Sequence, residues 1–454
     1  MDRPPPLAPA RARLGEPLRR MADVLPDLVD SRVGVVKELT ELPRDAGAPD
    51  FFHFYAQACN TVAFTRQVNF YAAGGASADR GMAVAKAVGE AVERYCGAIY
   101  EVEELPLRTR NEAPFPCVDP SAFAHYSEEQ YTSDGFPFVP FDDDTPVRWV
   151  PAVDALTGVE AWVPAAKVYV PYTYYLGTGD APICQPISTG LACHMSPAEA
   201  ASSGICEVIE RDAVTLTWQA MISPPRIQVE TLSDANYDLV QRFERSGGEV
   251  TLLDITTDVG VPTVMSVLRC RAADQPALVV AASTSLDAEE AARKSLEELA
   301  HTRRYSQQIN MKLPRLVVDA PHFENVTGQI SHLNFWCDQA NAHHADFLLA
   351  SKKRVEFDAL PRQTMGGTPG ELLALARMVE ATGCRVYLCD VTTPDVRELG
   401  FSVVRAVLPG YHPLALGFAF RARGGRRLYE LPQRLGHKGI TRERGENPIP
   451  HPYP

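Results

Sequence analysis

Two hydrophobic periods alternate along this chain of 454 residues. Within residues 33–74 the apolar positions come in short runs, VGVVKEL, FFHFYAQACNTV and VNFYAAG, which predict β-strands. Within residues 82–98, 199–211 and 294–303 they recur every three or four positions, which predicts amphipathic helices. Strands and helices mixed in this order predict an α/β (mixed α+β) fold.

The second half of the chain contains a repeated unit of helix, strand, turn and strand, in residues 234–269 and again in residues 369–408. In both copies a hydrophobic strand ends in Asp-x-Thr-Thr, beginning at Asp254 and at Asp390. Asp and Thr at strand ends favour turns in which their side chains accept backbone N–H groups. We also expect a hairpin at residues 423–427.

The chain is long enough for several domains or for one large domain. We expect a lead-in rich in Pro and Arg over residues 1–32 and a C-terminal tail over residues 431–454. Between them, residues 33–430 are expected to form one domain of two intertwined halves, 33–215 and 216–430.

Acidic residues recur at matched positions in the predicted helices. The first helix has Glu90, Glu93 and Arg94 in the pattern E-x-x-E-R, with Lys86 four residues earlier. A solvated amphipathic helix would also carry such charges, but it gives no reason for the pattern to repeat. The second helix repeats it with Ser203, Glu207, Glu210 and Arg211, preceded by Glu199.

A weaker third copy lies in KSLEELAHTR, where Glu298 follows Lys294 by four residues. Arg293 with Glu297 offers the same spacing, so the register of this copy stays open between Glu297 and Glu298. Three helices with acids and bases at matched offsets predict one shared polar site.

Carboxylates gathered in such a site must either have raised pKa values or bind cations. The six candidates are Glu90, Glu93, Glu199, Glu207, Glu210 and Glu298. With no His or Cys at ligand spacing, the metal would be hard, and Mg²⁺ bound by carboxylates commonly bridges to substrate phosphates. Lys86, Arg94 and Arg211 would contact phosphates directly. The residues therefore predict a Mg²⁺-nucleotide site.

Two small-residue segments precede these helices. Gly74 and Gly75 fit neither the GxxxxGK[ST] nor the GxGxxG phosphate-binding pattern, so we expect a plain turn there. Ser188, Thr189 and Gly190 are expected at a strand-to-helix turn, where they either contact a ligand or cap the helix.

Charge and cysteine content exclude several classes. A net charge of −13 without a long basic run argues against nucleic-acid binding. The N-terminal sequence lacks a signal peptide, and no run of eighteen apolar residues occurs, so we expect a cytoplasmic protein without a membrane segment. Ten cysteines without a CxxC pair predict free thiols and argue against structural zinc.

The chain closes with NPIPHPYP, in which Pro448, Pro450, Pro452 and Pro454 alternate with other residues. Alternating prolines favour an extended segment that cannot continue a helix or pair normally in a sheet. Pro-rich tails of this kind are commonly disordered or bind another domain.

Three long motifs resemble the YcaO family of ATP-using enzymes that modify peptide backbones. They are KAVGEAVERY, STGLACHMSPAEAASSGICEVIERDAVTLTW and VYLCDVTTPDVRELGFSVVRAVLPGYHPL. The resemblance runs from about Val33 to the end of the chain. The ending PIPHPYP resembles the PxPxP terminus of the azoline-forming branch, the cyclodehydratases of thiazole/oxazole-modified peptides.

The resemblance implies a YcaO-type fold with an ATP site between helices and no P-loop. It implies that the matched basic and polar residues Lys86, Arg94, Ser188, Arg211, Arg293 and Lys294 bind ATP and that the six glutamates named above hold Mg²⁺. Lys86 stands where many members have Ser, and Thr189 stands where many have Asn.

The implied reaction is an ATP-dependent cyclodehydration that converts Cys, or Ser and Thr, of a ribosomal precursor peptide to thiazoline or oxazoline. Pro450, Pro452 and Pro454 would then be catalytic residues, with the Pro454 carboxylate entering the site to accept or orient a proton. Expected partners are the precursor peptide, an E1-like or ThiF-like leader-binding protein, a downstream flavin-dependent azoline dehydrogenase and further copies of this chain.

Two alternatives stay open. A thioamide-forming YcaO enzyme would share the ATP motifs, take an external sulfur donor and usually lack the PxPxP ending. A non-catalytic nucleotide-binding scaffold for a partner enzyme would be expected to have lost some of the glutamates, which are all present here.

Overall fold

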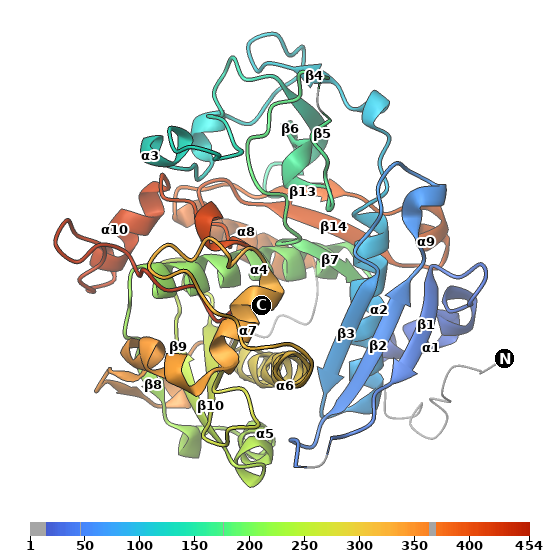
Figure 1. The fold of residues 1–454 in the computed structure, drawn as a ribbon. Coiled ribbons are helices and arrows are strands. Elements are labelled where there is room, and N and C mark those ends of the chain that lie inside the picture. The colour runs from blue at the N-terminus through green and yellow to red at the C-terminus, as the bar shows by residue number, and fades with distance from the viewer. Residues whose placement is uncertain (1–14, 46, 176, 363–368) are drawn as a thin grey trace.

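The computed structural model describes residues 15–45, 47–175, 177–362 and 369–454, and it contains three β-sheets with helices packed between and around them (Figure 1). Residues 1–14 of the expected lead-in lie outside the described part of the chain. The remainder of that lead-in contains α1 (Glu16–Leu28), whose Met21, Leu25 and Leu28 are buried in the core.

All but one of the strand pairs in the three sheets are antiparallel. The first sheet is β1 (Val36–Glu41), β2 (Phe52–Ala58) and β3 (Ala72–Ser77). The second has the order β4 (Leu107–Arg108), β5 (Val147–Asp154), β13 (Tyr387–Asp390), β14 (Ser402–Val407) and β7 (Leu191–His194), with β6 (Glu160–Pro164) also paired to β5. The third has the order β11 (Leu278–Thr284), β10 (Thr263–Cys270), β9 (Gly248–Asp254), β8 (Arg226–Ile227) and β12 (Arg354–Val355), and only its β8–β12 pair is parallel.

Each sheet packs against one of three central helices. Helix α2 (Arg80–Cys96) lies on β2 and β3, α4 (Pro197–Gln219) on β14, and α6 (Ala288–Lys312) on β10 and β11. The other helices are α3 (Glu128–Tyr131), α5 (Asp234–Arg245), α7 (Gln329–Cys337), α8 (Pro369–Ala381), α9 (Pro394–Glu398) and α10 (Arg426–Arg434). The three central helices are those that the apolar periodicity predicts.

Local sequence accounts for where two of these helices begin. Asp79 precedes α2 and its side chain accepts the N–H of Met82, and Asp287 precedes α6 and accepts the N–H of Glu289. These bonds satisfy N–H groups that the first turn of a helix leaves free. Helix α4 extends eight residues past the predicted end at Arg211, because its last turns, which include Trp218, are buried in the core.

The predicted repeat of helix, strand, turn and strand is present. Its first copy is α5, β9 and β10 in the third sheet, and its second copy is α8, β13 and β14 in the second sheet. Asp254 accepts the N–H of Thr256 and Asp390 that of Thr392, both at 3.0 Å, as the Asp-x-Thr-Thr pattern predicts. The hairpin expected at residues 423–427 is wrong, because α10 begins at Arg426.

The plain turn expected at Gly74 and Gly75 is also wrong, since both glycines lie inside β3 and pair with Tyr55 and Phe54. Close packing, not a turn, requires glycine here. A Cβ on Gly75 would lie 2.4 Å from the carbonyl oxygen of Ala83, and one on Gly74 would lie 2.5 Å from His301 Nε2. The glycines let β3 approach α2 and α6.

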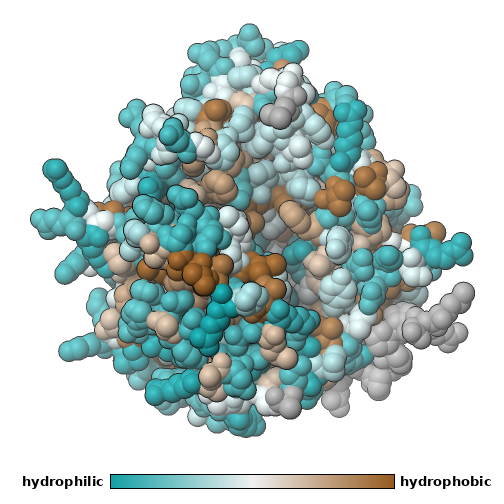
Figure 2. All heavy atoms as spheres, in the orientation of Figure 1, coloured by the Kyte–Doolittle hydropathy of each residue, from teal (hydrophilic) through white to brown (hydrophobic). Residues whose placement is uncertain are grey.

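The C-terminal segment packs in the interior, and Figure 1 marks the chain end near the centre of the molecule. Trp218 Nε1 donates to the carbonyl of Ile449 at 2.8 Å, and Trp336 Nε1 donates to that of Pro450 at 3.0 Å. His332 stacks on His451, with 4.1 Å between ring centroids. In the same orientation, Figure 2 shows apolar residues gathered near the centre of the visible surface, surrounded by mostly hydrophilic residues.

The cysteines agree with the sequence analysis. All ten cysteines are free, and each is buried or half-buried. Within the described ranges, none of the helices combines the length and apolarity needed to cross a bilayer.

Replacing Gly75 by Ala is predicted to destabilise the protein by about 1–3 kcal/mol, because the new Cβ would overlap backbone atoms of α2. The matched control is Gly89→Ala in α2, where a Cβ meets nothing within 4 Å and removal of a helical glycine stabilises by about 0.5–1 kcal/mol. Chemical denaturation would measure both. Equal stability of Gly75→Ala and the wild type would contradict the packing described here.

Candidate functional site

Five of the six glutamates singled out in the sequence influence one another electrostatically. Glu207 and Glu90 both raise the pKa of Glu93, and Glu207 and Glu298 both raise the pKa of Glu210. These residues come from α2, α4 and α6, so the three central helices share one acidic region, as the repeated motif predicts. We call these five residues the glutamate cluster: Glu90, Glu93, Glu207, Glu210 and Glu298.

Glu90 is held by the arginine one helical turn later and by the first sheet. Its Oε1 lies 2.5 Å from Arg94 Nη2, and its Oε2 accepts the N–H of Gly74 at 2.7 Å. Arg94 also donates to the carbonyl of Ala72, so both residues are fixed against β3. This contact explains why the glycine strand and the E-x-x-E-R helix lie next to each other.

Glu93 points toward the second sheet, where its Oε1 accepts the N–H of Cys193 in β7 at 2.7 Å. Burial raises the pKa of Glu93 well above its usual value, and the negative charges of Glu207 and Glu90 raise it further. The Cys193 N–H and Arg94 oppose this shift. The positive charge near Glu93 is therefore too small to stabilise its ionised form against burial and the neighbouring carboxylates.

Glu207 binds the turn that leads into β7. Its Oε2 accepts the N–H of Gly190 at 2.9 Å, and its Oε1 lies 3.3 Å from Arg211 Nη2. Gly190 has φ +90°, and a Cβ there would lie 2.4 Å from the Ala406 carbonyl oxygen, so glycine is required.

The strand-to-helix turn expected at Ser188, Thr189 and Gly190 needs correction, because the short strand β7 lies between this turn and α4. Ser188 closes the turn through its backbone carbonyl, which accepts the N–H of Leu191 at 2.9 Å, and the residue is exposed. The group that this turn offers to the glutamate cluster is the N–H of Gly190.

Glu210 and Arg211 contact the end of the chain. Tyr453 donates its hydroxyl to Glu210 Oε1 at 2.5 Å, and Arg211 Nη1 donates to the carbonyl oxygen of Pro454 at 2.9 Å. The Arg211 guanidinium also lies over the Tyr453 ring, 4.6 Å from its centroid. The tail thus reaches the glutamate cluster with its last two residues, while Pro450 and Pro452 are buried on the way there.

The Glu210 carboxyl group has a pKa near neutral pH. Burial raises its pKa to about 7, and the neighbouring charges of Glu207 and Glu298 act in the same direction. Arg211 and the Tyr453 hydroxyl oppose the shift. At pH 7 the carboxyl group is therefore close to half protonated.

In the third helix, Glu297 and Glu298 have different surroundings. The Glu297 side chain is 2 % exposed, and its Oε2 lies 2.8 Å from both Lys86 Nζ and Arg293 Nη1. Ser77 donates to its Oε1 at 2.5 Å.

Glu298 belongs instead to the glutamate cluster and lies 3.4 Å from His301 Nδ1. Burial raises its pKa, but His301, Lys86 and Arg211 together lower it to about 2. Both alternative registers of the third motif therefore place a carboxylate near Lys86.

The remaining predicted residues form a flanking group beside the cluster. Glu199 Oε2 lies 2.7 Å from His194 Nδ1, and Lys294 Nζ lies 3.0 Å from Glu290 Oε1. Glu199, Lys294 and Glu290 all affect the pKa of His194, which burial lowers, so the four residues lie together. Arg293 connects this group to Glu297, because its Nη2 lies 3.6 Å from Glu290 Oε1 and its Nη1 lies 2.8 Å from Glu297 Oε2.

The donor set fits a hard divalent cation that is shared with a ligand. In the part of the chain that the structure describes, nowhere do three His, Cys, Asp or Glu side chains converge tightly enough to hold a metal ion alone. The pKa values of Glu93 and Glu210 are nevertheless raised, because the nearby cationic groups do not offset burial and the neighbouring carboxylates. Mg²⁺ commonly binds one or two carboxylates together with water and substrate phosphates, which suits such a site.

Several groups at this site were missed in the sequence. The backbone N–H groups of Gly74, Gly190 and Cys193 each bind a cluster glutamate, and any residue type supplies such a donor. His301 lies one turn beyond Glu298 and was visible in the motif KSLEELAHTR. Tyr453 lies between two prolines of the tail, and its partner Glu210 is 243 residues away.

Comparison with known proteins begins with a family model described as YcaO cyclodehydratase, ATP- and Mg²⁺-binding, which matches residues 74–412. An uncharacterized protein from Methanothermobacter thermautotrophicus is 28% identical over 414 residues, which cover 88% of this chain and 94% of that protein.

Three solved structures share the fold. A heterocyclase in complex with substrate and cofactor has a TM-score of 0.76 at 20% identity, and the match covers 96% of this chain but only 57% of the heterocyclase. YcaO from Methanopyrus kandleri bound with AMPPCP and Mg²⁺ has a TM-score of 0.62 at 21% identity, covering 87% of this chain and 90% of that one. The Escherichia coli microcin synthetase McbBCD complex with pro-MccB17 bound contains a chain with a TM-score of 0.56 at 16% identity, covering 91% of this chain and 96% of that one.

These structures confirm the predicted mixed α+β fold of YcaO type. The region that matches the family model contains all three helices of the glutamate cluster and about three quarters of the chain. The chain belongs to the YcaO family, whose members are described as cyclodehydratases that bind ATP and Mg²⁺.

Proposed function

We propose that this chain is an ATP-dependent peptide cyclodehydratase that converts Cys, and Ser or Thr where they are presented, to thiazoline or oxazoline. The observation that carries the proposal is the arrival of the tail at the glutamate cluster. Arg211 binds Glu207 and the Pro454 carbonyl oxygen at once, so one guanidinium links the expected nucleotide site to the end of the chain.

The proposed reaction balances without an added oxidant or reductant. The side-chain thiol or hydroxyl adds to the carbonyl carbon of the preceding amide and loses its proton. The resulting oxyanion attacks the γ-phosphorus of ATP, and ADP leaves. The amide nitrogen then loses its proton, the C–O bond breaks and phosphate departs with the oxygen. The peptide loses one water in total, because ATP has turned a poor oxide leaving group into phosphate.

The chain's own residues would position the nucleotide and compensate charge. Glu90, Glu93, Glu207, Glu210 and Glu298 are the proposed Mg²⁺ ligands, and Mg²⁺ would supply charge stabilisation on the phosphates when bound. Arg94 and Arg211 already contact cluster glutamates and can turn part of their donors toward phosphate oxygens.

The flanking residues extend the proposed nucleotide site. Lys86 and Arg293 hold Glu297 between them, and Lys294 pairs with Glu290, so each presents positive charge beside the cluster. We propose that these three bind phosphate oxygens. Glu199, which lies near Lys294 and Glu290 of α6, would be a further metal ligand. Ser188, which is exposed in the turn before β7, would contact the nucleotide.

The tail would act close to the reacting amide. Pro450 and Pro452 keep the segment extended because proline fixes φ, and the oxygen that binds Arg211 would belong to the Pro454 carboxylate. This oxygen is the proposed acceptor or orienter of the proton released during ring formation. Tyr453 positions it by binding Glu210.

We also propose that the precursor peptide is delivered by a separate E1-like or ThiF-like leader-binding protein in the cytoplasm. The McbBCD complex, which carries pro-MccB17, supports a multi-protein arrangement by analogy of fold. A downstream flavin-dependent azoline dehydrogenase and self-association of this chain complete the proposed set of partners.

Intact mass of a Cys-, Ser- and Thr-containing precursor peptide, incubated with this protein, its delivery partner and Mg²⁺-ATP, tests the proposal. We expect loss of one water mass per modified residue, matched by ADP formation and absent with AMPPCP. An oxygen-for-sulfur mass change would assign the chain to thioamide formation instead. Unchanged peptide in the presence of bound ATP would favour the scaffold alternative.

The affinity for Mg²⁺-AMPPCP is predicted to rise about ten-fold between pH 6 and pH 8, because the Glu210 carboxyl, with a pKa of about 7, must lose its proton to bind metal. Protonation is nearly complete at pH 6 and nearly absent at pH 8, which fixes the sign. Titration calorimetry at both values, repeated with Glu210→Gln, separates this effect from titration of the nucleotide. Identical pH dependence in the two proteins would contradict the assignment.

Glu207→Gln is predicted to lower ATP-dependent ring formation by on the order of 100-fold, because it removes a charged ligand of the proposed metal site. Glu244→Gln on the exposed side of α5 is the matched control and should keep wild-type activity. The measurement is ADP release coupled to peptide mass. Full activity of Glu207→Gln would exclude Glu207 as a metal ligand.

Removal of residues 452–454 is predicted to abolish ring formation while changing the affinity for Mg²⁺-AMPPCP less than about three-fold, since the cluster glutamates remain in place. The affinity measurement serves as the control for folding. Near-normal ring formation in the truncated protein would overturn the proposed role of the tail.

A further inference from the structure

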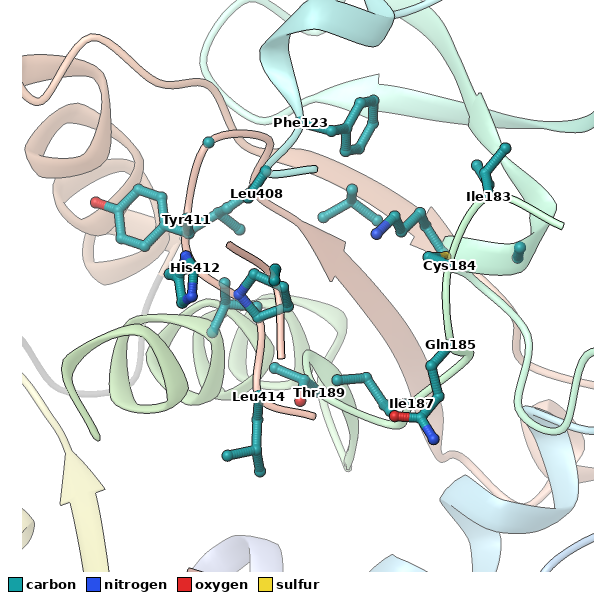
Figure 3. A pocket seen from close by; sticks show the side chains of 18 of the residues that line it. Phe123, Ile183, Cys184, Gln185, Ile187, Thr189, Leu408, Tyr411, His412 and Leu414 are labelled. Atoms are coloured by element: carbon teal, nitrogen blue, oxygen red, sulfur yellow. The ribbon is translucent and has the colours of Figure 1, made fainter. Parts of the chain in front are cut away.

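A hollow of about 870 Å³, its open mouth included, lies between residues 183–189, the end of β14 and residues 408–414 (Figure 3). Its wall is mostly apolar and includes Ile183, Ile187, Leu408 and Leu414.

Arg405 of β14 gives the hollow a specific polar group. The residue is only 4% exposed, and its Nη2 donates to the carbonyl of Ile187 at 2.8 Å. Its Nε and Nη1 are buried and have no hydrogen-bond partner in the structure. Burial lowers the pKa of Arg405 to about 10, although Glu207 opposes this shift. Buried arginine donors are normally satisfied, so these two indicate a missing acceptor.

The hollow adjoins both parts of the proposed active site. Thr189 and Val208 line it, and each is next in sequence to a residue of the Gly190–Glu207 hydrogen bond. Leu414 also lines it, and the following residue, Ala415, accepts a hydrogen bond from the tail residue His451 at 2.8 Å. A molecule in this hollow would therefore lie beside the glutamates and the tail.

We propose that this hollow binds the precursor peptide next to the residue being modified. An aliphatic side chain packs against Ile183, Ile187 and Leu414, and Arg405 donates hydrogen bonds to a backbone carbonyl of the same segment. The wall offers the donors of Arg405 and Lys167 beside apolar side chains, and a peptide supplies carbonyl acceptors and an apolar side chain a few bonds apart. The inference rests on the proposed function, because that reaction requires a peptide beside the nucleotide.

The test uses a defined probe, acetyl-Gly-photoleucine-Gly-Cys-Gly-amide, with the full-length protein and Mg²⁺-AMPPCP. After irradiation, digestion and tandem mass spectrometry locate the adducts. We expect them within residues 123–126, 183–189 and 408–414. Arg405→Met, which keeps the bulk of the side chain but removes its donors, should reduce labelling at least five-fold.

A second variant does not touch the glutamate cluster. Ala124 is a partly exposed residue of the wall, and Ala124→Trp would fill the mouth of the hollow and reduce labelling to a similar extent. Val159→Trp on the exposed β5–β6 turn is the matched control and should label like the wild type. Circular dichroism of each variant reports its folding.

Three results would overturn the inference. The first is that adducts are absent or located elsewhere, and the second is unchanged labelling in Ala124→Trp. The third is labelling of the hollow that occurs without AMPPCP but is lost in its presence, which would assign the hollow to the nucleotide. Failure of the proposed function looks different. Labelled hollow residues without ATP-dependent water loss would retain the peptide site and reject cyclodehydration, whereas water loss without labelling here would reject only the peptide site.

Discussion

Mutual repulsion of carboxylates is the constraint around which this structure is arranged. Five glutamates from α2, α4 and α6 act on one another, and two of them have pKa values raised by burial and by their neighbours. Such an arrangement costs free energy in the absence of cations. We propose that bound Mg²⁺ and nucleotide offset this cost, in line with the ATP- and Mg²⁺-binding description of the YcaO family.

The fold tolerates this repulsion by directing neutral and cationic donors at the same carboxylates. Backbone N–H groups of β3, the turn before β7 and β7 itself each bind one glutamate, and Arg94 and Arg211 each pair with the glutamate one turn earlier. Each of the three sheets positions one of the three helices that carry the glutamates. The tail adds Tyr453 and Pro454 from the far end of the chain, so the acidic site and the C-terminus depend on each other.

Local patterns predicted the parts of this site that lie on single helices. The three central helices, the repeated strand units and the Asp-x-Thr-Thr turns follow from apolar period and side-chain chemistry. The strand position of Gly74 and Gly75 could not be predicted in this way, because glycine is equally typical of turns and the need for it comes from α2 and α6.

Contacts between distant segments were also outside the reach of the sequence. Spacing alone left Glu297 and Glu298 equivalent, whereas the structure places one between Lys86 and Arg293 and the other in the cluster. Arg405 lies in the apolar run FSVVRAVLP and is unremarkable there, and only its missing partners show its importance.

The most direct test of the account is a crystal structure of this chain with AMPPCP and Mn²⁺, which replaces Mg²⁺ and gives an anomalous signal. We expect anomalous peaks within about 2.5 Å of carboxylate oxygens of the glutamate cluster, between these carboxylates and the phosphates of AMPPCP. Nucleotide and metal bound away from α2, α4 and α6, or anomalous peaks with no cluster carboxylate in contact, would contradict it.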